Sequence, residues 1–102
     1  MSDDDVLIAY LMDDAWLTLE QVAGACMVEP DWLMRHVDEG LFPHAVSVAG
    51  VWRFSSASLR RARRMRQLER DFDAIPELAA LVADLLEEMD DLHARLRCTS
   101  RG

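Results

Sequence analysis

The sequence predicts a mainly helical fold, in which a helix-turn-helix head with a small β-hairpin wing precedes a C-terminal helical hairpin or coiled coil. Two short helical patterns joined by a few residues come first, and a β-rich stretch with a two-residue, Gly-containing turn follows them. An Arg-rich helical pattern and a heptad-like repeat complete the chain. We expect a head over residues 1–57 and a stalk over residues 58–102, forming one compact unit.

Capping signals predict the helix-turn-helix. Thr18 and Gln21 form a capping-box pattern at the start of the first helix. Pro30 suits the first turn of a second helix, which Gly40 ends. The apolar positions of the first helix share one face: Leu19, Val22, Ala23 and Cys26. Ahead of both helices, the apolar stretch Val6–Met12 lacks a clear period, and we interpret it as an edge strand or an extended arm.

The wing is predicted from two short β-rich runs, Val46–Val48 and Val51–Phe54, on either side of an Ala-Gly turn. Trp52 and Phe54 fall on the same face of the second strand. They could form an exposed docking patch, but core packing is favoured because a wing strand usually turns its aromatic side chains inward.

A third helix begins at a cluster of candidate capping serines, Ser55, Ser56 and Ser58, and runs through an arginine cluster to about Asp73. Its apolar stripe comprises Leu59, Ala62, Met65, Leu68 and Phe72. The arginines could grip phosphates, but a solvated helix face that pairs with acids of the last helix is favoured. The acids expected in these pairs are Asp84, Glu87, Glu88 and Asp91.

The last helix carries the strongest pattern in the chain, an apolar seam that follows the interruption at Ile75–Pro76. The seam residues, spaced alternately four and three apart, are Leu78, Val82, Leu85, Met89, Leu92 and Leu96. Leu81 and Leu86 widen the stripe. We expect the helix to pack on the third helix, on a second copy of itself, or on both, and the width of the stripe predicts a homodimer.

Charge is distributed unevenly along the chain, whose formal net charge is −8. Residues 1–39 hold ten acids against Arg35 alone, whereas residues 40–70 hold seven arginines against Glu69. Duplex DNA is normally held by clustered cations, so the acidic head disfavours nucleic acid and suits a basic protein partner better. The basic middle segment keeps DNA binding open as an alternative.

Several classes of function have no candidate residues. No serine has the nucleophile-elbow setting and no glycine-rich loop is present, so we expect neither an enzyme nor a bound cofactor. The three histidines and two cysteines do not stand at a zinc spacing, so we expect no metal. The acidic start and the lack of a long apolar run predict a cytoplasmic protein with no membrane contact.

Four segments carry a resemblance to a known family: LTLEQVAGACMVEPDWL, VDEGLFPH, VWRFSSASLRRARRMRQLERDF and ELAALVADLLEEMDDLHARLR. Over residues 18–97 the chain is similar to the head of the MerR regulators, and it resembles the CbpM chaperone-modulator family more closely. The latter resemblance rests on the Trp-x-Phe wing strand, the Arg-rich helix ending in RQLERDF and the short stalk. It implies binding to the J-domain of a DnaJ- or CbpA-like co-chaperone, which restrains engagement of that co-chaperone with Hsp70.

The chain departs from the DNA-binding pattern in its second helix. MerR heads typically carry an Arg followed by two Tyr shortly before Gly-Leu, and those places hold Met34, Arg35 and His36 here. The departure favours the modulator branch over the alternative, a MerR-like DNA-binding transcriptional regulator. A third interpretation, a subunit that only oligomerises, leaves the head unexplained.

The second helix is the predicted partner-binding site, with Trp32 as an amphipathic anchor. The proposed contact residues are Asp31, Trp32, Arg35, Asp38 and Glu39. Two alternatives stay open: these acids could be solvated surface, with Asp31 complementing the helix start, or the partner could contact the stalk acids Glu87, Glu88 and Asp91 instead.

Overall fold

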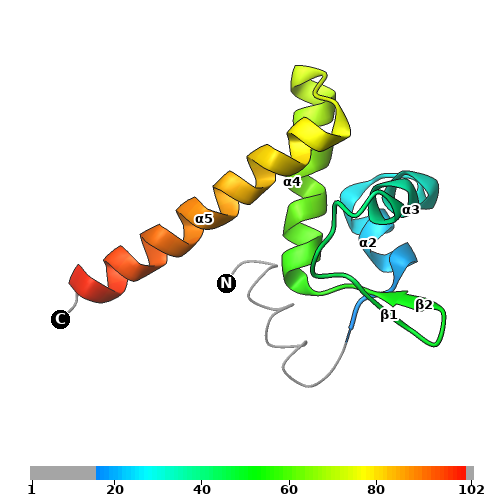
Figure 1. Cartoon of the computed structure of the whole chain (residues 1–102), viewed down its shortest axis with the longest axis horizontal. Coiled ribbons are helices and arrows are strands. Elements are labelled where there is room, and N and C mark those ends of the chain that lie inside the picture. Colours follow the sequence, from blue (N-terminus) through cyan, green and yellow to red (C-terminus); the bar gives the residue numbers. More distant parts are fainter. Residues whose placement is uncertain (1–15, 101–102) are drawn as a thin grey trace.

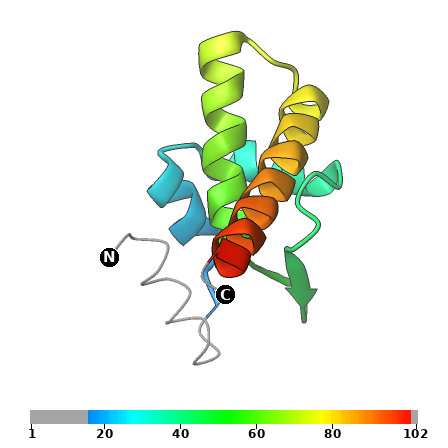
Figure 2. The ribbon, with the colours of Figure 1, turned by 90° about the vertical axis from the view of Figure 1, so that its left-hand side faces the viewer.

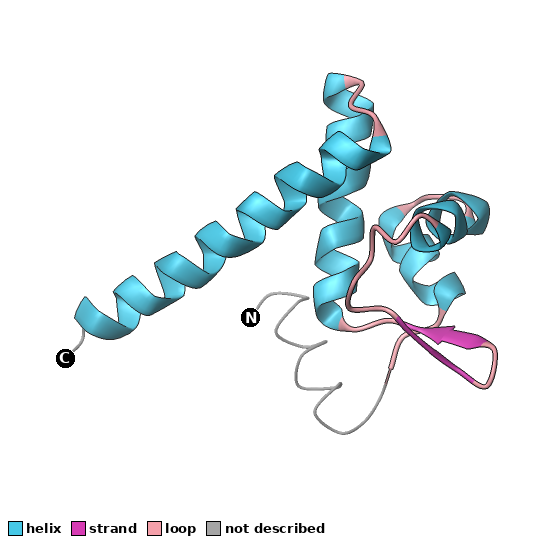
Figure 3. Cartoon of the chain, in the orientation of Figure 1, coloured by secondary structure: helices cyan, strands magenta, loops and turns pink. Residues whose placement is uncertain are grey.

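The computed structural model of the chain describes residues 16–100, with side chains described through Cys98. The arm predicted at Val6–Met12 lies outside the described residues. The elements follow in the predicted order (Figures 1 and 3): α2 (Leu19–Cys26), α3 (Pro30–Asp38), β1 (Val46–Val48), β2 (Val51–Arg53), α4 (Ser56–Phe72) and α5 (Pro76–Ser100). The predicted mainly helical fold, with a hairpin between helices and a long C-terminal helix, is therefore confirmed.

The predicted capping box starts α2. The Gln21 N–H donates to Thr18 Oγ1 at 3.1 Å, and the Thr18 N–H donates to Gln21 Oε1 at 2.8 Å. Pro30 is the first residue of α3, where no backbone donor is needed. Between the two helices, Met27 adopts the left-handed conformation with a φ of 56° and closes α2 through its backbone N–H.

The wing is a two-residue hairpin in which both turn residues, Ala49 and Gly50, have positive φ. This geometry matches the twist of an antiparallel pair. A further bridge ties the entry of α2 to the end of the wing, since Leu17 and Phe54 exchange backbone hydrogen bonds of 3.0 and 2.9 Å. Phe54 is fully buried, and Trp52 is partly buried and packs against the core, so the predicted inward packing is confirmed.

The core gathers around α4, which packs against α2 on one side and α5 on another. Leu59, Ala62 and Met65 of the predicted stripe are buried there, and Leu68 is partly buried. The prediction is wrong for Phe72, which is 75% exposed. Phe72 is the last residue of α4, at the end of the helix that extends beyond α2 and α3 (Figure 1), so no neighbouring helix covers it.

A row of small residues, Ala79, Ala80 and Ala83, places α5 against α4. The apolar seam lies on a different face of α5, where Leu78, Leu85, Met89, Leu92 and Leu96 are between 49% and 62% exposed. Every side chain from residue 88 to residue 98 is exposed. The C-terminal half of α5 therefore projects away from the head (Figures 1 and 2).

One arginine of the cluster, Arg61, is buried, with 3% of the residue exposed, which corrects the expectation of a wholly solvated arginine face. Its Nη1 donates to Asp84 Oδ1 at 2.6 Å and to Glu87 Oε2 at 2.8 Å, so the predicted pairing with these two acids of the last helix is confirmed. Its Nε donates to the Leu41 carbonyl at 2.7 Å. The guanidinium is buried because α5 and the loop after α3 both close over it.

Removing the charge of Asp84 and Glu87 should destabilise the protein by about 3 kcal/mol, because it leaves the buried Arg61 guanidinium without a counter-charge. The change is Asp84→Asn with Glu87→Gln, and the free energy of unfolding in urea measures it. Asp90→Asn is the control: it removes an ion pair with Arg64, whose side chain is 28% exposed against 3% for Arg61, and should cost less than about 1 kcal/mol. Equal losses of unfolding free energy in the two variants would show that burial of Arg61 does not increase the cost of removing its partners.

Candidate functional site

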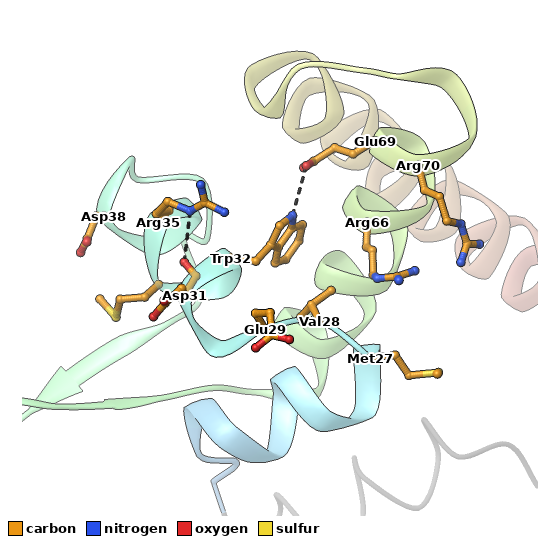
Figure 4. A pocket seen from close by; sticks show the side chains of 11 residues that line it. Met27, Val28, Glu29, Asp31, Trp32, Arg35, Asp38, Arg66, Glu69 and Arg70 are labelled. Atoms are coloured by element: carbon orange, nitrogen blue, oxygen red, sulfur yellow. Dashed lines mark hydrogen bonds between the residues drawn. The ribbon is translucent and has the colours of Figure 1, made fainter.

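A groove of about 930 Å³ opens between α3, the turn that precedes it, and α4 (Figure 4). We call it the α3–α4 groove. Its lining combines apolar, acidic and basic side chains from these three segments. The lining residues are Met27, Val28, Glu29, Asp31, Trp32, Met34, Arg35, Asp38, Arg66, Glu69 and Arg70.

The groove brings together most of the residues predicted to bind a partner. Asp31, Trp32, Arg35 and Asp38 all line it, whereas Glu39, which caps the C-terminus of α3, does not. Within this set, Arg35 Nε donates to the backbone carbonyl of Asp31 at 3.4 Å. The proposed site is thus a wall of a groove rather than a flat helix face.

Trp32 points from α3 across the groove toward α4 (Figure 4). Its indole Nε1–H donates to Glu69 Oε1 at 3.2 Å. One face of the indole stacks on the His36 ring, with 3.9 Å between ring centroids and 29° between ring planes. Trp32 is only partly buried, so it keeps surface available in the groove.

His36 completes the link between α3 and α4. Its Nδ1–H donates to the Trp32 carbonyl at 2.7 Å, and its Nε2 lies 2.7 Å from Glu69 Oε2. The Trp32 carbonyl can only accept a hydrogen bond, so His36 Nδ1 carries a proton. The contact between Nε2 and Glu69 Oε2 needs a second proton, which is carried by either the imidazole or the carboxyl group. Both arrangements are neutral overall, which suits a pair with little solvent exposure. Glu69 therefore holds both ring systems of α3 through one carboxyl group.

The two walls of the groove carry opposite charge. The α3 side has three exposed acids, Glu29, Asp31 and Asp38, against Arg35. The α4 side has Arg66 and Arg70 against Glu69, whose carboxyl group already contacts Trp32 and His36. The net charge is therefore negative on the α3 side and positive on the α4 side. Apolar lining residues lie among these charged side chains, and Met27 stands out because it is 82% exposed. An apolar strip between charged edges is the composition expected of a protein-binding surface.

The α4 wall and the turn before α3 were not predicted from the sequence. Arg66, Glu69 and Arg70 have the helical spacing that places them on one face, and Glu69 is the single acid in a segment with seven arginines. Those two signals could have indicated a special role for Glu69. Met27 is the left-handed C-cap of α2, a position where Gly or Asn is usual. A methionine there gives no sequence signal for a helix end, so Met27 was not predicted.

Two observations bear on metal binding and on the reactivity of the buried cysteine. Among them, no group of three or more His, Cys, Asp or Glu side chains is placed to hold a metal ion. Burial raises the pKa of the Cys26 thiol, and the nearby Arg63 and Arg66 oppose this shift only in part. Cys26 is therefore a protonated thiol at neutral pH, a poor nucleophile. No helix in the described part of the chain is both long enough and apolar enough to cross a membrane.

Replacing Glu69 tests whether its carboxyl group holds α3 on α4. Glu69→Leu leaves the Trp32 indole N–H without its acceptor and His36 Nε2 without its hydrogen-bond partner, so the free energy of unfolding should fall by about 2 kcal/mol. Glu69→Gln keeps an acceptor oxygen and should lose less. Urea denaturation gives the energies, and the Trp32 indole N–H resonance reports the contact directly. Equal stability of both variants and the unmodified protein would contradict the assigned role.

Comparison with known proteins gives one match to a family model. The model described as MerR HTH family regulatory protein matches residues 17–101, which include every helix and strand described above. Comparisons with curated proteins and with solved structures gave no significant match. Because the family model covers most of the chain and the observed fold has the order of elements expected of it, the chain belongs to the MerR family of helix-turn-helix regulatory proteins.

Proposed function

We propose that this protein is a cytoplasmic, non-enzymatic chaperone modulator, which binds the J-domain of a DnaJ- or CbpA-like co-chaperone and blocks its engagement with Hsp70. The α3–α4 groove is the proposed docking surface, with the acids of α3 facing a basic helix of the J-domain. The observation that carries the proposal is the charge of α3. The mechanism is steric, because the bound head covers the surface that Hsp70 would contact.

The charge of α3 opposes DNA reading. In helix-turn-helix proteins that read DNA, the second helix enters the major groove and its outward side chains meet bases and phosphates. The exposed charged side chains of α3 are Asp31, Arg35 and Asp38, and Glu39 follows at its C-cap. Three acids against one arginine would repel phosphates, whereas they attract a basic protein helix.

The apolar part of the groove also supports a protein partner. Trp, Met and Arg are enriched at the centres of protein interfaces, and the groove offers Trp32, Met27 and Met34 beside its arginines. A DNA-binding face would gain little from exposed methionines. The resemblance to the CbpM family adds the identity of the partner, which the residues of the groove do not specify.

The alternative function, a DNA-binding transcriptional regulator, has two observations in its favour. The family is one of helix-turn-helix regulators. In addition, Arg53 is exposed on the wing strand β2, where a cation could contact a phosphate. These observations keep DNA binding as the second candidate.

We also propose a homodimer formed through α5. The exposed seam continues along the half of α5 that projects from the head, and a single helix with this much exposed apolar surface is poorly stabilised alone. The face bearing Ala79, Ala80 and Ala83 is already packed on α4, so the seam can pair with a second copy without disturbing the head.

Charge reversal in the groove should weaken binding to the purified J-domain of a CbpA-type co-chaperone. Asp31→Lys with Asp38→Lys should lower the association rate about tenfold, with a weaker salt dependence, because these acids steer the encounter. Surface plasmon resonance measures both. The matched control is Glu88→Lys with Asp91→Lys on α5, which should leave the rates unchanged. Glu87 is not used, since it pairs with Arg61.

A large fall in the association rate for the α5 control, with no change for the groove variant, would contradict this assignment. It would place the J-domain on the stalk. Failure of the unmodified protein to bind any J-domain would reject the function itself. A gel shift of random duplex DNA at micromolar protein, with a steep dependence on salt, would instead support the regulator.

Acidic substitutions in the seam should dissociate the homodimer. Leu85→Asp with Met89→Asp places two charges at the middle of the proposed interface, where they cannot be solvated. Light scattering of the unmodified protein should give twice the chain mass of 11.6 kDa, and the double variant should give the monomer mass. Ala94→Asp, on the exposed helix face away from the seam, is the control and should stay dimeric. A monomeric unmodified protein would end this proposal.

A further inference from the structure

The α3–α4 groove should discriminate between partner proteins more sharply than an acidic patch would, because its α4 wall has a net positive charge. Arg66 and Arg70 stand four residues apart on α4 and both line the groove. Arg70 pairs with its neighbour Asp71 at 3.2 Å, but both side chains are well exposed, so this contact gives way readily. Within residues 16–98, Arg66 forms no ion pair or hydrogen bond with a carboxylate. A purely basic partner would therefore be attracted by one wall and repelled by the other.

The strip between the walls is apolar, and its Trp32 side chain is held in a fixed orientation. The Trp32 ring is fixed by Glu69 and by the stack on His36. Met27 is 82% exposed, and it occupies the left-handed C-cap of α2 with a φ of 56°.

We propose that the groove receives one amphipathic helix of a partner protein, with cationic side chains along the flank that faces α3, carboxylates along the flank that faces α4, and an apolar ridge over Met27 and Trp32. The inference deepens the proposed function, on which it rests for the use of this groove. Two features favour a helix as the ligand of the groove. The groove is open and bounded by helices, as in helix-in-groove recognition, and its charged residues lie along the edges (Figure 4). A small-molecule pocket would instead enclose a few convergent polar groups.

The probes are three stapled helical peptides that share one apolar ridge. The mixed peptide carries Lys on one flank and Glu on the other, and the two comparison peptides carry Lys on both flanks or Glu on both. Fluorescence anisotropy with the full-length protein should show the mixed peptide binding roughly fivefold more tightly than either comparison, since each rim pair is worth a few-fold in affinity. Reversing the peptide exchanges its flanks between the walls, so the mixed peptide can bind in the one direction that places Lys toward α3 and Glu toward α4.

The α4 wall is tested by Arg66→Glu with Arg70→Glu, which makes both walls acidic. The preference should then shift to the peptide with Lys on both flanks. If that variant fails to fold by circular dichroism, Arg66→Gln with Arg70→Gln should still abolish the preference for the mixed peptide over the Lys peptide. An unmodified protein that prefers the Lys peptide, or variants with unchanged preferences, would overturn the proposal.

Met27→Gly separates the docking role of Met27 from a structural one. Glycine relieves the left-handed conformation, so the urea midpoint should rise, while loss of the side chain should weaken the mixed peptide about threefold. A variant with unchanged affinity would exclude Met27 from the docking strip and overturn that part of the proposal.

The J-domain measurement distinguishes the two proposals. If the J-domain binds but Arg66→Gln with Arg70→Gln leaves its affinity unchanged and no mixed peptide binds, the helix proposal fails and the proposed function stands. If the mixed peptide binds and the J-domain does not, the groove recognises this class of helix and the proposed function fails.

Discussion

The carboxyl group of Glu69 is the interaction on which the candidate site depends. It reaches from α4 to two rings of α3, the Trp32 indole and the His36 imidazole, which would otherwise present unsatisfied polar atoms near the core. Because both contacts end on one side chain, they fix the position of α3 relative to α4 and the orientation of Trp32. The width of the groove and the separation of its charged walls follow from this geometry.

The second constraint acts on the other side of α4, where Arg61 joins the loop after α3 to α5. This network and the alanine row occupy one face of α5 and leave its apolar seam on another. The molecule thus separates two surfaces: a groove in the head suited to a partner, and a seam on the stalk suited to a second copy. The two proposed interactions can therefore occur together.

Local signals in the sequence predicted the elements well. The Thr18–Gln21 capping box, Pro30 at the start of α3 and the Ala49-Gly50 turn each depend on residues close in the chain. Arg61 and Glu69 contact partners 23 and 33 residues away, so local patterns could not specify the burial of Arg61 or the two rings that Glu69 holds. The sequence consequently predicted the α3 wall of the groove, through Asp31 and Trp32, but not the α4 wall.

We propose that the α3–α4 groove binds protein rather than DNA. A titration of the isotope-labelled protein with a purified CbpA-type J-domain, followed by two-dimensional NMR, tests it most directly. Docking in the groove should give the largest chemical-shift changes at Met27, the Trp32 indole N–H and Arg66, with the wing strands unchanged. Shifts confined to the wing or to α5, or a response to duplex DNA on α3 at physiological salt, would contradict it.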